Sequence, residues 1–142
     1  TLPNTLTTIG SYAFQSNKLT SLTIPASVET IGDHAFENNQ LTSLTIPSSV
    51  ETIDERAFSN NQLTTINFEP NSRLKTIGIY AFGSNKLTNT GLSKLPSSLI
   101  SLDTIAFNSN TNLTQITLTS PKDLPGWPNG GTVNGKTVTY ER

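Results

Sequence analysis

Residues 24–46 read IPASVETIGDHAFENNQLTSLTI, and the segment that follows, residues 46–68, reads IPSSVETIDERAFSNNQLTTINF. The two segments share most of their residues, and the same pattern extends in both directions along the chain. An Ala-Phe pair marks every unit, and its phenylalanines lie 22 to 25 residues apart: Phe14, Phe36, Phe58, Phe82 and Phe107. A period of this length is the signature of a repeat architecture in which each unit forms one coil of a stack.

The composition agrees with a thin core and excludes several classes of protein. The chain has 142 residues, a net charge of −1 and 33% hydrophobic residues, and each unit contributes about seven apolar positions. A net charge near zero gives no electrostatic footprint for nucleic acid or an anionic membrane, and no apolar run is long enough to span a bilayer. The chain has no cysteine and one histidine, so disulfides, thiolate sites and histidine metal clusters are excluded. We therefore expect no cofactor, no metal, no nucleic-acid partner and no membrane insertion.

Within one unit, the order of residues predicts the shape of a coil. The pattern L-x-x-L-x-I at residues 41–46 ends in an alternation of period two, which predicts a short strand. Pro47 ends this strand because proline has no N–H to donate. Gly32 belongs to a column that predicts a turn with positive φ, and the Ala-Phe pair predicts a short helical or 3-10 turn. We expect about five coils of 22 to 26 residues over residues 1–118, with a parallel sheet on the concave side and the short turns on the convex side.

The unit L-x-x-L-x-I-P-x-S-V-x-x-I-G-x-x-A-F-x-x-N resembles the leucine-rich repeat of BspA-like bacterial surface proteins, over about residues 2–118. The resemblance implies a leucine-rich-repeat solenoid, an extracellular or cell-surface location, and a role in adhesion or protein binding. Two features depart from the family pattern. Asparagine occupies a column in which the family often has cysteine, and the join between the fourth and fifth units is irregular, with Thr90 in an inward slot and added residues at 91–95.

A column of asparagines follows the phenylalanines at a spacing of three residues. We interpret this column as structural, because a side-chain amide at this place can bond the backbone of its own coil and of the next one. Replacing Asn39 by alanine should leave buried backbone groups unpaired and lower the stability by about 1–3 kcal/mol. The column consists of Asn17, Asn39, Asn61, Asn85 and Asn110.

The outward positions of the predicted strands are the candidate binding surface, because solenoids of this kind commonly bind partners on the sheet. They carry no charge and no aromatic residue, so the surface is suited to hydrogen bonding with a protein or a glycan. The candidate residues are Ser21, Thr23, Ser43, Thr45, Thr65, Asn67, Asn89 and Gln115. Threonine also suits an exposed strand for structural reasons alone. Two alternatives therefore stay open: a structural spacer in a larger surface protein, and an accessory glycan-binding domain of a larger enzyme.

The opposite side of the coil carries most of the charge. Glu29 and Glu51 occupy neighbouring positions in one column, and strand-like spacing places such carboxylates about 5 Å apart, as in retaining glycosidases. A convex surface offers neither a cleft nor a dry environment that would separate two pKa values, so we predict that the chain is not an enzyme. The lone histidine, His34, is expected to lie on the solvent-facing shell.

The repeat pattern stops after Leu118, and residues 119–142 are expected to form a C-terminal cap. Asn134-Gly135 predicts a two-residue hairpin turn inside this segment. Trp127 and Tyr140 fit either a cap over the last coil or an exposed aromatic platform for a ligand. The first residues already match the middle of a repeat unit, so we expect that the N-terminal end is uncapped and that the chain is a fragment of a longer array. We also expect weak end-to-end self-association through this exposed end.

Overall fold

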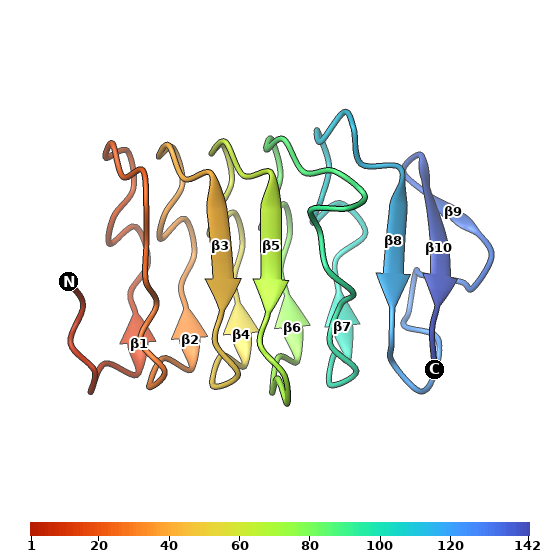
Figure 1. The fold of residues 1–142 in the computed structure, drawn as a ribbon, viewed down its shortest axis with the longest axis horizontal. Coiled ribbons are helices and arrows are strands. Elements are labelled where there is room, and N and C mark those ends of the chain that lie inside the picture. The colour runs from red at the N-terminus through yellow and green to blue at the C-terminus, as the bar shows by residue number, and fades with distance from the viewer.

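A computed structural model, which describes all of residues 1–142, shows a parallel β-solenoid of about six turns with no helices (Figure 1). Each coil runs down one face of the stack and returns up the other, so the strands of the two faces point in opposite directions. The predicted leucine-rich-repeat solenoid is therefore confirmed. The stack has about six turns where five were expected, because the C-terminal segment adds one.

One face, here called the short-strand face, carries a continuous five-stranded parallel sheet in the order β1-β2-β4-β6-β7. Each strand is only two residues long, and its second residue is a buried Ile or Leu that points into the core. The five strands are β1 (Thr8–Ile9), β2 (Thr30–Ile31), β4 (Thr52–Ile53), β6 (Thr76–Ile77) and β7 (Ser101–Leu102).

The opposite face, here called the long-strand face, carries the longer strands. The strand β3 (Ser43–Ile46) pairs in parallel with β5 (Thr65–Phe68), and β8 (Gln115–Leu118) pairs in parallel with β10 (Lys136–Tyr140). The L-x-x-L-x-I pattern predicts the first three of these strands, whereas β10 belongs to the C-terminal segment, which lacks the pattern. On this face, the coil that lies between β5 and β8 follows an irregular path at residues 91–95 and makes only isolated bridges, at Leu92 and Leu95 (Figure 1). The irregularity expected at this join therefore interrupts the sheet.

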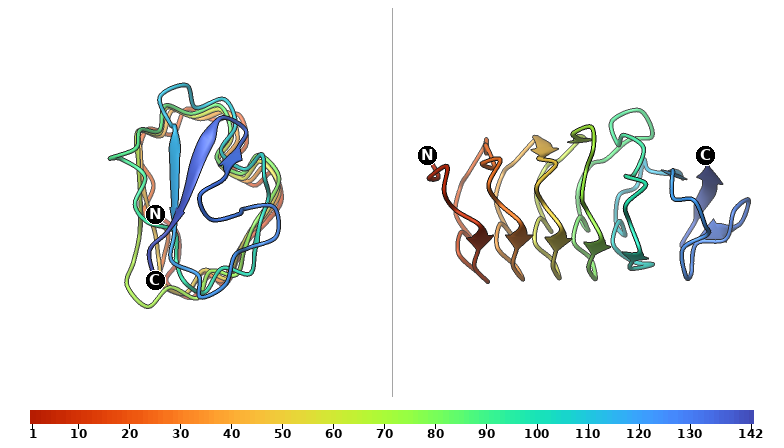
Figure 2. Two further views of the ribbon diagram at one scale, coloured as in Figure 1. Left: turned by 90° about the vertical axis from the view of Figure 1, so that its right-hand side faces the viewer. Right: turned by 90° about the horizontal axis from the view of Figure 1, so that it is seen from below.

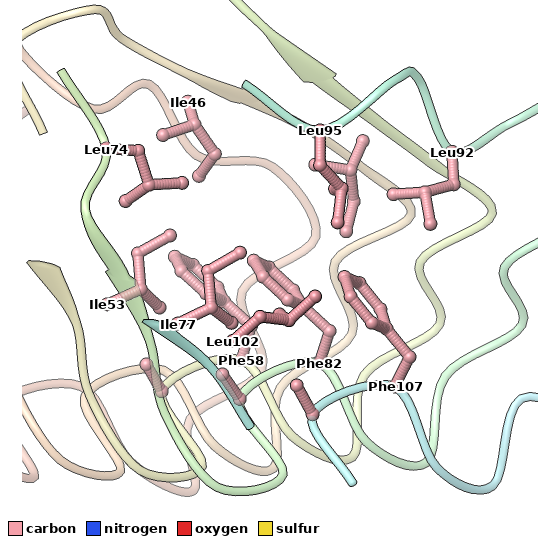
Figure 3. Packing of buried hydrophobic residues seen from close by; sticks show 14 of the residues in the cluster. Ile46, Ile53, Phe58, Leu74, Ile77, Phe82, Leu92, Leu95, Leu102 and Phe107 are labelled. Carbon is pink, nitrogen blue, oxygen red and sulfur yellow. The ribbon is translucent and has the colours of Figure 1, made fainter. Parts of the chain in front are cut away.

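The core between the two faces has one layer per coil. The phenylalanine rings of successive coils are stacked in parallel, with centroids 5.2 to 5.6 Å apart, and four of the five are fully buried. In Figure 3, the rings of Phe58, Phe82 and Phe107 form one row below Ile46, Leu92 and Leu95. Each coil thus covers the apolar layer of the preceding one, which is how a chain with few apolar residues forms a core.

The turn at the Ala-Phe pair is not helical, and the positive φ falls at a different residue from the one expected. Ala35 N donates to Gly32 O and Glu37 N to His34 O, which makes two successive four-residue turns. His34, which belongs to both turns, has a φ of 57°, and this left-handed conformation prevents a helix. The φ of Gly32 is not positive. Glycine is instead required for close approach, because a Cβ at Gly32 would lie 2.8 Å from the backbone N of Ser11 in the preceding coil.

The stack is nearly straight. Viewed end-on, successive coils overlie one another closely (Figure 2). Backbone hydrogen bonds of 2.8 Å join neighbouring coils at several places around the cross-section, including Glu51 N to Glu29 O, Phe36 N to Ala57 O and Gln62 N to Leu41 O. Because the coils have the same spacing on every side, the long-strand face, which was expected to be concave, is nearly flat along the stack.

Residues 119–142 wind one further turn over the fifth coil. Their strand β9 (Thr132–Val133) pairs with β10 in an antiparallel hairpin around Asn134 and Gly135, both of which have positive φ. The indole of Trp127 is 1% exposed, and its Nε1 donates to Leu102 O at 2.8 Å. The hydroxyl of Tyr140 accepts from Leu124 N and donates to Trp127 O, so neither aromatic ring forms an open platform.

Candidate binding surface

The period-two alternation of the long strands decides which side chains reach solvent. In β3 and β5, Leu44 and Ile66 point inward, whereas the residues on either side of them are exposed. The parallel register places Ser43 beside Thr65 and Thr45 beside Asn67. Neighbouring coils therefore present their polar side chains in rows that cross the strands.

Five of the eight predicted binding residues line one shallow hollow on the long-strand face. The hollow has a volume of about 390 Å³ and is lined by Thr23, Ser43, Thr45, Thr65 and Asn67, among others. We call the first four of these residues the Thr band, with Asn67 at its border. All five side chains are exposed and make no hydrogen bond within the chain, so their donors and acceptors are free for a partner.

The other three predicted residues lie outside this hollow. Ser21 faces a separate, more apolar hollow of about 570 Å³ beside the first coil. Asn89 has a structural task, since its Oδ1 accepts from Thr114 N and Gln115 N, and its Nδ2 donates to Thr114 Oγ1. The side chain of Gln115 is exposed, but its backbone is held by Asn89. Asn89 thus replaces strand hydrogen bonds that the irregular join would leave unmade.

The asparagine column bonds the coil that precedes it rather than the one that follows. Asn61 Nδ2 donates to Phe58 O of its own coil and to Phe36 O of the preceding coil, both at 3.0 Å, and its Oδ1 accepts from Leu41 N at 3.1 Å. Asn39, Asn85 and Asn110 repeat this arrangement and are buried, whereas Asn17 is exposed and bonds only its own coil. The four buried amides are therefore occupied by backbone groups and are not available to a ligand.

A third hollow, which no sequence pattern predicted, lies at the junction of the third, fourth and fifth coils. Two adjoining spaces of about 510 and 280 Å³ meet at the ring of Phe68 and the side chain of Lys94. Phe68 is half-buried, although it occupies an inward position of β5. The extra length of residues 68–77 relative to 46–53, together with the insertion at 91–95, is the sequence signal that could have pointed here.

Several charged side chains beside the short-strand face are in contact with one another. Glu51 Oε1 lies 2.9 Å from Lys75 Nζ, and this contact lowers the pKa of the Glu51 carboxyl, opposite to what a general acid requires. His34 Nδ1 contacts Glu37 Oε1 at 2.7 Å, and its ring stacks on Tyr12 with centroids 4.7 Å apart. Burial raises the pKa of Asp54, and the nearby carboxylate of Asp33 raises it further. No three acidic or histidine side chains converge on a point where a metal ion could bind.

Comparisons with known proteins identify the repeat but no individual relative. A family model described as BspA type leucine rich repeat region matches residues 1–114 in six copies. A search of curated proteins and a search of solved structures gave no match. The chain also contains no helix with the length and apolar character that crossing a membrane requires.

Proposed function

Because this chain belongs to the BspA-type leucine-rich repeat family, we propose that it is a non-enzymatic adhesion module that binds a partner protein outside the cell or at its surface. Membership of this repeat family supports a role in interaction with other proteins. The Thr band is the surface that we assign to this interaction.

The observation that carries the proposal is the set of free polar groups in the hollow of about 390 Å³. The backbone beneath Thr45 and Thr65 is held in a paired sheet, so the spacing of these side chains is set before a partner arrives. A rigid surface loses little conformational entropy on binding. The band contains no Trp, Tyr or Arg, the residues that dominate strong hot spots, so we expect modest affinity.

A non-enzymatic role agrees with the chemistry of the remaining surface. The carboxylate of Glu51 is neutralised by Lys75, and no deep pocket brings a nucleophile, a base and an orienting group together. His34 is engaged with Glu37 and with the ring of Tyr12. The paired carboxylate and the engaged imidazole support a role in binding rather than in catalysis.

The test is binding of the chain to a panel of extracellular-matrix and bacterial surface proteins, measured by surface plasmon resonance at two salt concentrations. The variant T45R/T65R places two bulky cations in the Thr band and should weaken saturable binding by about tenfold or more. The matched control S11R/I100R adds the same charges at exposed positions away from the band and should bind as the wild type does. Binding that both variants lose equally, or that neither loses, would contradict the assignment of the surface.

The straightness of the stack favours one alternative, a spacer that holds other parts of a larger surface protein apart. Neighbouring coils are joined by hydrogen bonds around their cross-section, so the stack resists bending. A spacer needs no binding surface. If no protein in the panel gives saturable binding while the chain is folded, the spacer function is favoured over adhesion.

A further inference from the structure

We propose that the hollow at the junction of the third, fourth and fifth coils binds a neutral sugar ring of a surface glycan. We call it the junction groove, and its residues are Asn67, Phe68, Glu69, Ser93, Lys94 and Thr117. This site goes beyond protein binding through the Thr band and uses different side chains, with Asn67 at the border of both.

The junction groove exists because an extra residue displaces one coil from its neighbour. Ile66 and Phe68 are separated by a single residue in β5, whereas two residues, Ser93 and Lys94, separate their counterparts Leu92 and Leu95. An extra residue of this kind is a bulge, a device that re-aims side chains next to functional sites. The fourth coil therefore covers Phe68 only in part.

Phe68 is the only large apolar side chain outside the first coil that packs against the core and is still partly exposed. The same position in other coils carries an aliphatic residue that is at most 5% exposed: Ile24, Ile46, Leu95 and Leu118. The partly exposed ring of Phe68 lines both spaces of the groove and offers an apolar surface on which the C–H groups of a pyranose can pack.

Polar groups frame the ring on several sides. The amide of Asn67 and the hydroxyl of Thr117 have no partner within the chain and can bond sugar hydroxyls. Lys94, which lines both spaces, forms an exposed ion pair with Glu141. Glu69 Oε1 accepts from Ser48 N at 2.9 Å, which orients this carboxylate at the rim.

The charge of the groove favours neutral ligands over acidic ones. Its two ionised groups, Glu69 and Lys94, carry opposite charges, so the groove has no net positive charge to attract a uronic or sulfated sugar. The size agrees with a small ligand, since adjoining spaces of about 510 and 280 Å³ fall near the range of small-molecule sites. A peptide adding as a β-strand is disfavoured, because both backbone groups of Ile66 are already bonded, to Gly91 O and Ser93 N.

The test replaces residues of the groove by those that the preceding coil carries at the same positions of the repeat. F68I and N67T restore the residues that the preceding coil carries at these positions, Ile46 and Thr45, so N67T/F68I should fold with an unchanged melting temperature. The probes are neutral gluco-, galacto-, manno- and N-acetylglucosamine oligosaccharides, titrated by calorimetry and by NMR chemical shifts. We expect saturable binding of at least one probe with a Kd of about 1 mM, weakened about tenfold or more in F68I and in N67T/F68I.

The Thr-band variant T45R/T65R is the matched control and should retain sugar binding. Loss of sugar binding in F68I with protein binding intact supports the groove and leaves the adhesion function standing. The proposal is overturned if no neutral probe saturates, if F68I binds as well as the wild type, or if the groove binds only peptides or acidic glycans. None of these results would by itself contradict protein binding through the Thr band.

Discussion

The amide of Asn61 shows how one side chain can tie two coils together at a point where the backbone has no ladder partner. Its three contacts, to Phe36 O, Phe58 O and Leu41 N, satisfy buried groups of two successive coils. Alanine would leave these groups unpaired and too deeply buried for water to replace the amide. We predict that N61A lowers the free energy of unfolding by about 1–3 kcal/mol in urea denaturation.

Asn17 provides the matched control for this prediction. It occupies the same column, but it is exposed and its Nδ2 bonds only carbonyl groups of its own coil. N17A should therefore change the stability by less than about 1 kcal/mol. If N17A and N61A lowered the free energy of unfolding equally, the asparagines would act through local turn preference rather than through hydrogen bonds between coils.

Glu37 makes the stability depend on pH. Burial raises the pKa of its carboxyl, but hydrogen bonds from His34 and Gln15 outweigh burial and hold the pKa below its ordinary value of 4.5. A carboxyl with a lowered folded-state pKa stabilises the fold above its unfolded-state pKa, and this contribution is lost as the pH falls through the folded-state value. We predict that the stability difference between wild type and E37Q narrows between about pH 6 and about pH 3, measured by urea denaturation at each pH. A difference that stays constant over this range would contradict the role of Glu37.

At the scale of elements, the long strands could be predicted and the short ones could not. The pattern from Leu41 to Ile46 carries both the spacing and the alternation of a strand, and β3 forms there. A two-residue strand such as Thr52–Ile53 is too short for any alternation to be visible, so its sheet emerges only from the stacking of coils. The exposure of Phe68 likewise depends on the displaced coil beyond it, which no pattern within β5 could indicate.

The irregular segment between β5 and β8 depends on a glycine at its centre. A Cβ on Gly91 would lie 2.0 Å from Thr64 O, which belongs to the backbone of the preceding coil and cannot easily move. We predict that G91A lowers the stability by about 1–3 kcal/mol and perturbs the NMR signals of Ile66 and Ser93, whose backbones are bonded across this contact. The control is G10A, since nothing lies within 4 Å of the added Cβ, and it should change the stability by no more than about 0.5 kcal/mol. A similar effect of the two substitutions would show that close approach is not the reason for Gly91.

At the scale of the whole molecule, the stack is a one-dimensional array whose coils touch only their neighbours. The sixth turn was not predictable, because residues 119–142 lack the L-x-x-L-x-I pattern and reach the same place with different residues. Val138 and Tyr140 of β10 lie beside Ile116 and Leu118 of β8, as the inward residues of a further coil would. A strand at the end of a stack is thus positioned by packing against the apolar layer of the coil beneath it, rather than by a repeat pattern in its own sequence.

Trp127 joins this last turn to the fifth coil, and its removal should show how far cooperativity extends along the stack. We predict that W127A costs about 3–5 kcal/mol, because it leaves a cavity and an unpaired carbonyl at Leu102. In an array with contacts only between neighbours, the loss should be local: amides of Thr137 and Glu141 should exchange much faster, whereas Gly32 and Gly78 should keep most of their protection in hydrogen-exchange measurements. If amide exchange became faster by the same factor along the whole chain, all the coils would unfold as one unit. The last turn would then determine the stability of every coil.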